Sequence, residues 1–146
     1  MRSHQAYRMR LFTFAAVAVL SVVQPLFADP AVDIPKIAGK EPAAVEKLLG
    51  KATEGEKTKH GKALVYQKGK VEIVYIKGKA DWITVNDLKD VPFDETATKA
   101  LGIEAAKPAF KGPMVIRWEP AGKLTSVAVF ELDGKVDYAY VKVATK

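Results

Sequence analysis

The sequence contains no cysteine, and this absence excludes several classes of site at once. Disulfide bonds, thiolate nucleophiles and cysteine-bound metals are ruled out, so the fold depends on its hydrophobic core alone. His60 is the single histidine after residue 28, and one histidine without cysteine is too little for the usual zinc ligand sets. We therefore predict no metal site and no cofactor.

Arginine is also scarce, because Arg117 is the single arginine after residue 28. Specific nucleic-acid sites favour arginine, whose planar fork pairs with phosphates and guanine edges. The formal net charge is +6, and it falls to +3 when Arg2, Arg8 and Arg10 are set aside with the N-terminal segment. A Lys-rich surface with interspersed acids is typical of a solubilising surface. We therefore expect no nucleic-acid partner.

The chain also lacks a motif for nucleophilic catalysis or phosphate binding. Ser126 is predicted at a strand start and His60 in a polar loop, so they do not form a serine–histidine pair. Asp81 and Asp137 each follow a Gly-Lys turn at equivalent places and could form a symmetric acidic pair. An aspartate just after such a turn is more often a polar surface residue. We predict a protein without catalytic residues, and an enzyme that uses these two carboxylates is an alternative.

The first 28 residues have the three parts of a secretory signal peptide. Arg2, Arg8 and Arg10 precede an apolar run from Leu11 to Val23, and Ala28 marks the expected cut. An apolar run of about 13 residues is too short to span a bilayer comfortably, although an uncleaved anchor is the alternative. We expect an exported soluble protein, periplasmic or extracellular, with one domain over residues 29–146 and no transmembrane segment after cleavage.

The stretch from Ala63 to Val85 is rich in β-branched and aromatic residues and predicts three strands. Two Lys-Gly-Lys turns, 68–70 and 77–79, separate these strands and suit tight hairpins. A further strand is predicted from Met114 to Trp118. A second hairpin is predicted over residues 127–143, around Asp133-Gly134.

Helices are predicted before each group of strands. Pro42 at a first helical position and Gly50 after the last one bound the first helix. Asp94 is a candidate N-cap for a second helix that ends at Leu101. The remaining segments are predicted as an extended lead-in over 29–37, a polar loop over 51–61 and irregular chain over 103–113.

The order of helix, loop and strands therefore occurs twice. Leu49-Gly50 matches Leu101-Gly102 at an offset of 52, and the segment from Gly78 to Trp82 matches residues 134–138 at an offset of 56. Coincidence between two ordinary hairpins is the alternative. We interpret the match as a duplication, with repeat one at about 39–86 and repeat two at about 93–143. The predicted fold class is α+β, with two αβββ repeats forming one antiparallel sheet of about six strands and short helices on one face.

The segments IAGKEPAAVEKLLGKA and VEIVYIKGKADWITV carry a resemblance to a known class. They resemble the repeat of β-lactamase-inhibitor-protein-like and SmpA/OmlA-type exported proteins. The chain departs from that pattern at Glu41, which replaces a hydroxyl cap, and it lacks the lipobox cysteine needed for membrane tethering. The resemblance implies a non-catalytic protein that presents an open sheet face to a partner.

Two-residue turns would place the apolar strand residues on two faces. One face is predicted to hold Tyr66, Val71, Ile73, Tyr75, Trp82, Val127, Val129, Val136, Tyr138 and Tyr140. The other is predicted to hold Val65, Val74, Ile76, Ile83, Val85, Phe130, Leu132, Ala139 and Val141. Two short helices cover one face, so the second is covered either by residues 103–113 with the lead-in or by a partner.

We predict a soluble exported binding or inhibitor-like protein that contacts another protein, or a second copy of itself, through an aromatic sheet face. The candidate binding residues are Tyr66, Tyr75, Trp82, Tyr138 and Tyr140, because aromatic side chains bury much area with little entropy loss. The alternative is a structural or assembly role in the cell envelope, with the Lys-rich surface in weak contact with anionic components.

Overall fold

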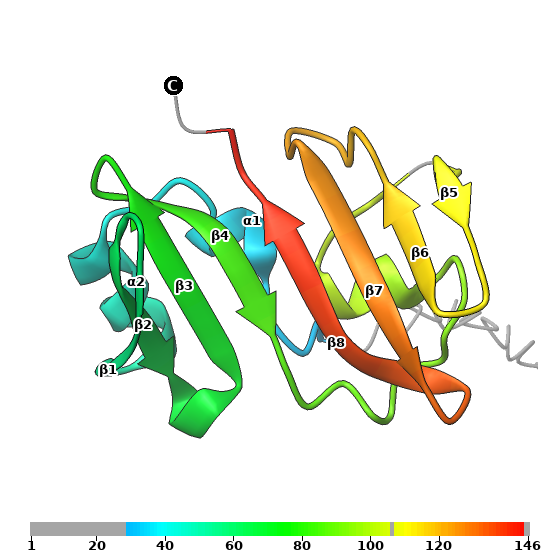
Figure 1. Cartoon of the computed structure of the whole chain (residues 1–146), viewed down its shortest axis with the longest axis horizontal. Helices are drawn as coiled ribbons and strands as arrows, with labels where there is room; N and C mark the ends of the chain where they lie inside the picture. Colours follow the sequence, from blue (N-terminus) through cyan, green and yellow to red (C-terminus); the bar gives the residue numbers. More distant parts are fainter. Residues whose placement is uncertain (1–28, 106, 145–146) are drawn as a thin grey trace, which may run out of the picture.

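The protein is built on one antiparallel sheet of eight strands, shown in Figure 1 as a computed structural model. The structure describes residues 29–105 and 107–144, so the predicted signal peptide lies outside the described residues. The strand order is β1-β2-β3-β4-β8-β7-β6-β5. The strands are β1 (Thr53–Thr58), β2 (Gly61–Tyr66), β3 (Val71–Ile76), β4 (Lys79–Val85), β5 (Phe110–Lys111), β6 (Val115–Trp118), β7 (Ser126–Leu132) and β8 (Lys135–Lys142).

Short helices cover one face of this sheet and lie behind it in Figure 1. They are α1 (Ile34–Ile37), α2 (Pro42–Leu49) and the 3-10 helix η2 (Ala97–Leu101), while a 3-10 turn, η1 (Gln67–Gly69), joins β2 to β3. Helix α2 has the predicted bounds, with Pro42 in its first turn and Gly50 at φ 88° after its end. The predicted α+β class and antiparallel sheet are confirmed.

The prediction of about six strands was too low because both edge strands were missed. Strand β1 lies in the segment predicted as a polar loop. It lacks the alternation of apolar and polar residues that marks a half-buried strand, because both of its faces are largely exposed. Charged residues are common on edge strands, where they discourage pairing with other chains. Strand β5 lies in the segment predicted as irregular and has only two residues.

Two helical predictions also need correction. The lead-in was predicted as extended, but residues 34–37 form α1, whose Ile34 and Ile37 are buried against the sheet. The second helix is shorter than predicted, because Asp94 caps a turn before η2 begins at Ala97. Gly102 ends η2 in the left-handed conformation, as its place after Leu101 predicted.

Two β-bulges overturn part of the predicted face assignment. In the β3–β4 hairpin the register shifts between Val74 and Tyr75, and in the β7–β8 hairpin it shifts between Phe130 and Glu131. An extra residue reverses the facing of every side chain beyond it on that strand. Trp82, Tyr138 and Tyr140 were predicted to share a face with Val71 and Val127. They lie on the opposite face instead. The residues that take their place among the buried side chains are Ile83, Val85, Ala139 and Val141.

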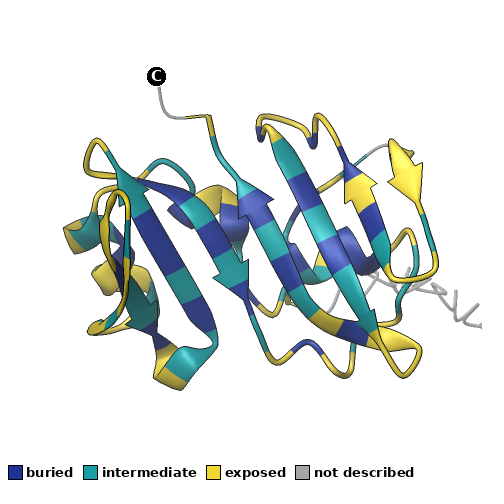
Figure 2. Ribbon diagram, in the orientation of Figure 1, coloured by how far each residue is buried: buried dark blue, intermediate teal, exposed yellow. Residues whose placement is uncertain are grey.

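The registers of the two hairpins agree pair by pair. Val71 pairs with Val85 as Val127 pairs with Val141, and the bulges fall at the same place at an offset of 56. Strands β4 and β8 pair antiparallel at the centre of the sheet, where Thr84 lies opposite Tyr140. Figure 2 shows the alternation of buried and half-buried residues along these central strands.

A single hydrophobic core fills the space between the sheet and the helices. Its largest fully buried side chains include Ile73 and Ile83 of the β3–β4 hairpin, Val127 of the β7–β8 hairpin, and Tyr66 and Trp118 of the strands beside them. Helix residues Ile34, Val45 and Leu101 close the core from the other side. The core is continuous across the β4–β8 pair, and it includes residues of both hairpins and of β2 and β6.

Candidate functional site: an open aromatic face and a pocket

The sheet face turned away from the helices, called here the open face, has no helix over it among residues 29–105 and 107–144. Its central side chains are half-buried or nearly buried: Val74, Trp82, Phe130, Tyr138, Tyr140 and Lys142. Phe130 and Tyr138 stack with their ring centroids 4.4 Å apart. The lead-in over 29–37 and the start of the 103–113 segment lie on the helix side instead. Pro35 of α1 lines the same pocket as Ile103 and Glu104.

The structure separates the five predicted binding residues into two groups. Trp82, Tyr138 and Tyr140 lie on the open face, where each is partly accessible. Tyr66 is fully buried in the core, and Tyr75 lies beside it on the helix side of β3. The Tyr66 and Tyr75 hydroxyl oxygens are 2.7 Å apart and share a hydrogen bond. Burial raises the pKa of Tyr75, and the hydrogen bond to Tyr66 raises it further.

Trp82 is the centre of a group of basic side chains on the open face. The ammonium nitrogens of Lys142 and Lys59 lie 5.1 Å and 5.6 Å from the centre of its ring. The ring of His60 meets it edge-on, with centroids 5.4 Å apart. Lys59 and His60 come from the tip of the β1–β2 hairpin, in the segment that was predicted as a loop. Cations are attracted to the electron-rich face of an indole ring at these distances.

Asp81 and Asp137 do not form the symmetric acidic pair considered from the sequence. Asp81 is fully buried at the β4 bulge and forms an ion pair with Lys142. Its backbone oxygen accepts a hydrogen bond from Val143, at one end of the β4–β8 pair. Asp137 is exposed and lies near the other end of β8, beside the β7–β8 turn. Desolvation and then the charge of Lys59 lower the pKa of Lys142.

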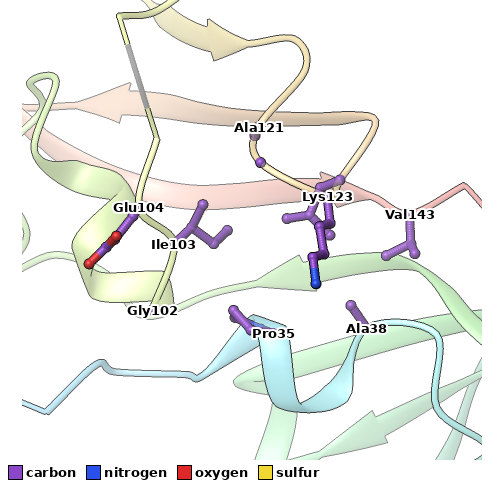
Figure 3. Close-up of a pocket in the computed structure, with 10 residues that line it drawn as sticks. Pro35, Ala38, Gly102, Ile103, Glu104, Ala121, Lys123 and Val143 are labelled. Atoms are coloured by element: carbon purple, nitrogen blue, oxygen red, sulfur yellow. The ribbon is translucent and has the colours of Figure 1, made fainter.

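A pocket of about 360 Å³ opens on the helix side, near the end of β8. Three segments that are distant in sequence form it: α1, the chain after η2, and the β6–β7 connection. Figure 3 shows Lys123 directing its Nζ atom across the mouth, toward Pro35 and Ala38. The Glu104 carboxylate points away from this side chain. The walls are mainly apolar and include Ile103, Ala121, Leu124 and Val143.

Residues 29–105 and 107–144 contain no group of three or more histidine, aspartate or glutamate side chains placed to hold a metal ion. The same residues contain no helix with the length and hydrophobicity needed to cross a membrane. Comparisons of the chain with protein-family models, curated proteins and solved structures returned no match.

The sequence did not reveal several of the residues described above. Lys59, His60 and Lys142 surround Trp82 only because the β1–β2 hairpin and β8 fold against the same part of β4. The pocket depends on tertiary contact between three loops and helix ends, so no periodic pattern marks it. One usable signal was present in the sequence. The spacing between equivalent residues of the two predicted repeats changes from 52 to 56, and the four additional residues lie in the β6–β7 connection, which forms a wall of the pocket.

Proposed function

We propose that this chain is a soluble exported binding protein without catalytic activity, and that its open face contacts a protein partner. The single observation that carries the proposal is the group of partly exposed aromatic rings at the centre of a sheet face with no described helix over it. Trp82, Tyr138 and Tyr140 supply large contact areas at low entropic cost, and such residues dominate many interfaces. Export remains a proposal that rests on the sequence of residues 1–28.

The charges around Trp82 favour an acidic partner. Lys59 and Lys142 approach the same indole ring, and their like charges repel. Lys142 is already ion-paired with Asp81, so an incoming carboxylate would pair chiefly with the Lys59 ammonium group and bring charge complementarity to an aromatic surface. The resemblance of the repeat segments to inhibitor-like and envelope-assembly repeats agrees with such a surface.

The tandem duplication is also part of the proposal. The matching registers and matching bulges of the β3–β4 and β7–β8 hairpins support it. Each proposed repeat then contains a helix and four strands, with β1 and β5 as the outermost members. In such an arrangement the two repeats are related by an approximate twofold axis near Thr84 and Tyr140.

Affinity capture with a matched pair of variants tests the open-face proposal. The wild-type protein, a Trp82→Ala/Tyr140→Ala variant and a Leu48→Ala variant would be compared as baits against an envelope fraction. Leu48 is an exposed leucine on α2, on the other side of the molecule, and serves as the control. A partner bound through the open face should be lost with the double variant, with at least about thirtyfold weaker binding, and kept with the control.

The same experiment contains the results that would overturn the proposal. Equal capture by the wild type and the open-face variant would show that the open face does not take part in the interaction. Capture that is insensitive to salt would contradict the proposal of an acidic partner, because partly exposed charge pairs weaken as the ionic strength rises. Sedimentation of the purified protein distinguishes self-association through this face, because a second copy would appear as a dimer that the double variant lacks.

A further inference from the structure

We propose that the pocket near the end of β8 binds a small amphiphilic carboxylate, with an apolar chain in the pocket and its carboxylate on Lys123. The pocket lies away from the open face, so this inference does not depend on the proposed protein partner. Its volume of about 360 Å³ is within the ordinary range of small-molecule sites. A chain of about eight to ten carbons suits a pocket of this size, and such sites are mainly apolar with a few polar groups.

The walls of the pocket supply the apolar part of the site. Ile103, Ala121 and Leu124 are buried by the fold, yet each contributes surface to the pocket. Pro35 and Ala38 of the α1 segment face them across the opening (Figure 3). Moving a hydrocarbon chain from water onto such walls is favourable, and each buried CH₂ group should strengthen binding about fourfold. An apolar tail would therefore add affinity with each carbon that fits.

Lys123 supplies the charged part of the site. The Lys123 side chain is exposed and extends across the mouth of the pocket. Its ammonium group is therefore accessible to a ligand. Within the described residues no carboxylate lies within ion-pair distance of it, and the nearby Glu104 carboxylate points elsewhere. A single cation above an apolar pocket selects a ligand with one negative head over a neutral or positive one.

The loop that carries Lys123 is held in place before any ligand arrives. Ala121 and Leu124 exchange two backbone hydrogen bonds, of 3.2 Å and 3.0 Å, which close the turn between them. Ala121 and Leu124 are also anchored by burial, with relative exposures of 1% and 8%. A site that is already ordered loses less entropy on binding than a loop that must fold around its ligand.

The pocket also lies where the two halves of the sheet differ. Val71 follows Tyr66 by five positions, whereas Val127 follows Trp118 by nine, although the two strand pairs have the same register. The longer connection contains Ala121, Lys123 and Leu124, and the shorter one forms only the turn η1. The additional residues thus build a wall that the β2–β3 connection does not build.

Calorimetric titration of the purified protein with decanoate, octanoate, decanol and decyltrimethylammonium, each below its micelle concentration, tests the proposal. Decanoate should bind, and octanoate should bind about fifteenfold more weakly because it buries two fewer CH₂ groups. Lys123→Gln should weaken decanoate binding about tenfold, the scale of one charge-assisted hydrogen bond, and should leave decanol binding unchanged. Lys47→Gln, at an exposed lysine of α2, is the matched control and should bind decanoate like the wild type.

Amide chemical shifts locate the bound chain. Decanoate should move the signals of Ile103, Ala121, Leu124 and Val143, and Ala38→Leu should abolish these shifts by filling the pocket while the circular dichroism spectrum stays unchanged. Equal affinity for decanoate and decanol would overturn the role of Lys123. Shifts confined to the open face, or no shifts, would overturn the site. The Trp82→Ala/Tyr140→Ala variant should still bind decanoate, so failure of the open-face proposal and failure of this one are distinguishable.

Discussion

At the residue scale, the pair formed by Tyr66 and Tyr75 links a buried hydrogen bond to the pH dependence of stability. Burial raises the pKa of both phenols, and their shared hydrogen bond raises the pKa of Tyr75 further. Below about pH 10 both phenols are neutral in the folded and unfolded chains. Above that pH the unfolded chain loses these protons while the folded chain retains them, so the free energy of unfolding falls as the pH rises.

Replacing Tyr75 by phenylalanine should make this alkaline loss of stability shallower. At neutral pH the variant should be destabilised by about 1 kcal/mol, because it loses the hydrogen bond with Tyr66. Urea unfolding at intervals from neutral pH to pH 11.5 measures both effects. A wild-type and a variant curve with the same slope above pH 10 would contradict the assigned role of this phenol.

Local chemistry explains which single residues could be predicted from the sequence. Gly50 and Gly134 were correctly placed at a helix end and a hairpin turn, because both adopt positive φ values that glycine tolerates best. Trp82 was assigned to the wrong face, because a bulge is a property of two paired strands and the turn sequence alone does not specify it. The burial of Asp81 was missed for the same reason, since a residue at a bulge leaves the regular alternation.

At the scale of elements, the buried strands were predictable and the edge strands were not. Strands β3, β4, β7 and β8 have apolar residues on the helix side, and the expected turns bound them. Strand β1 has no such pattern, and its Gly55 lies so close to β2 that an added Cβ would be 2.8 Å from the Val65 side chain. Its place in the sheet therefore depends on fitting against Val65 and Ala63, which composition does not reveal.

If the two hairpins arose by duplication, equivalent core substitutions should have similar effects. Val71 and Val127 are both fully buried, and each pairs with a valine at the same register. Val71→Ala and Val127→Ala should each lower the free energy of unfolding by about 2 kcal/mol, through lost burial and the cavity left behind. Chemical denaturation measures both. A difference above about 1.5 kcal/mol would show that the two sites are not structurally equivalent.

At the scale of the whole molecule, the continuous core predicts that both ends of the sheet unfold together. Trp82 lies on β4 and Trp118 on β6, so each tryptophan reports on a different part of the sheet. In Trp118→Phe and Trp82→Phe variants, the fluorescence of the remaining tryptophan and the circular dichroism signal of that same variant should give coincident urea transitions. Separate transitions within one variant would mean that the two hairpins and their flanking strands unfold independently.

The central position of β8 also has a consequence for how the protein is made. β8 is the last of the eight strands to leave the ribosome, yet it lies between β4 and β7. Until it emerges, β4 has only β3 beside it, β7 lacks its hairpin partner, and Ile83 and Val85 lack their cross-strand neighbours Val141 and Ala139. Until β8 emerges, the nascent chain is therefore unable to complete its core. Under the proposed export, such a topology would help to keep the polypeptide in the unfolded state that a translocation channel requires.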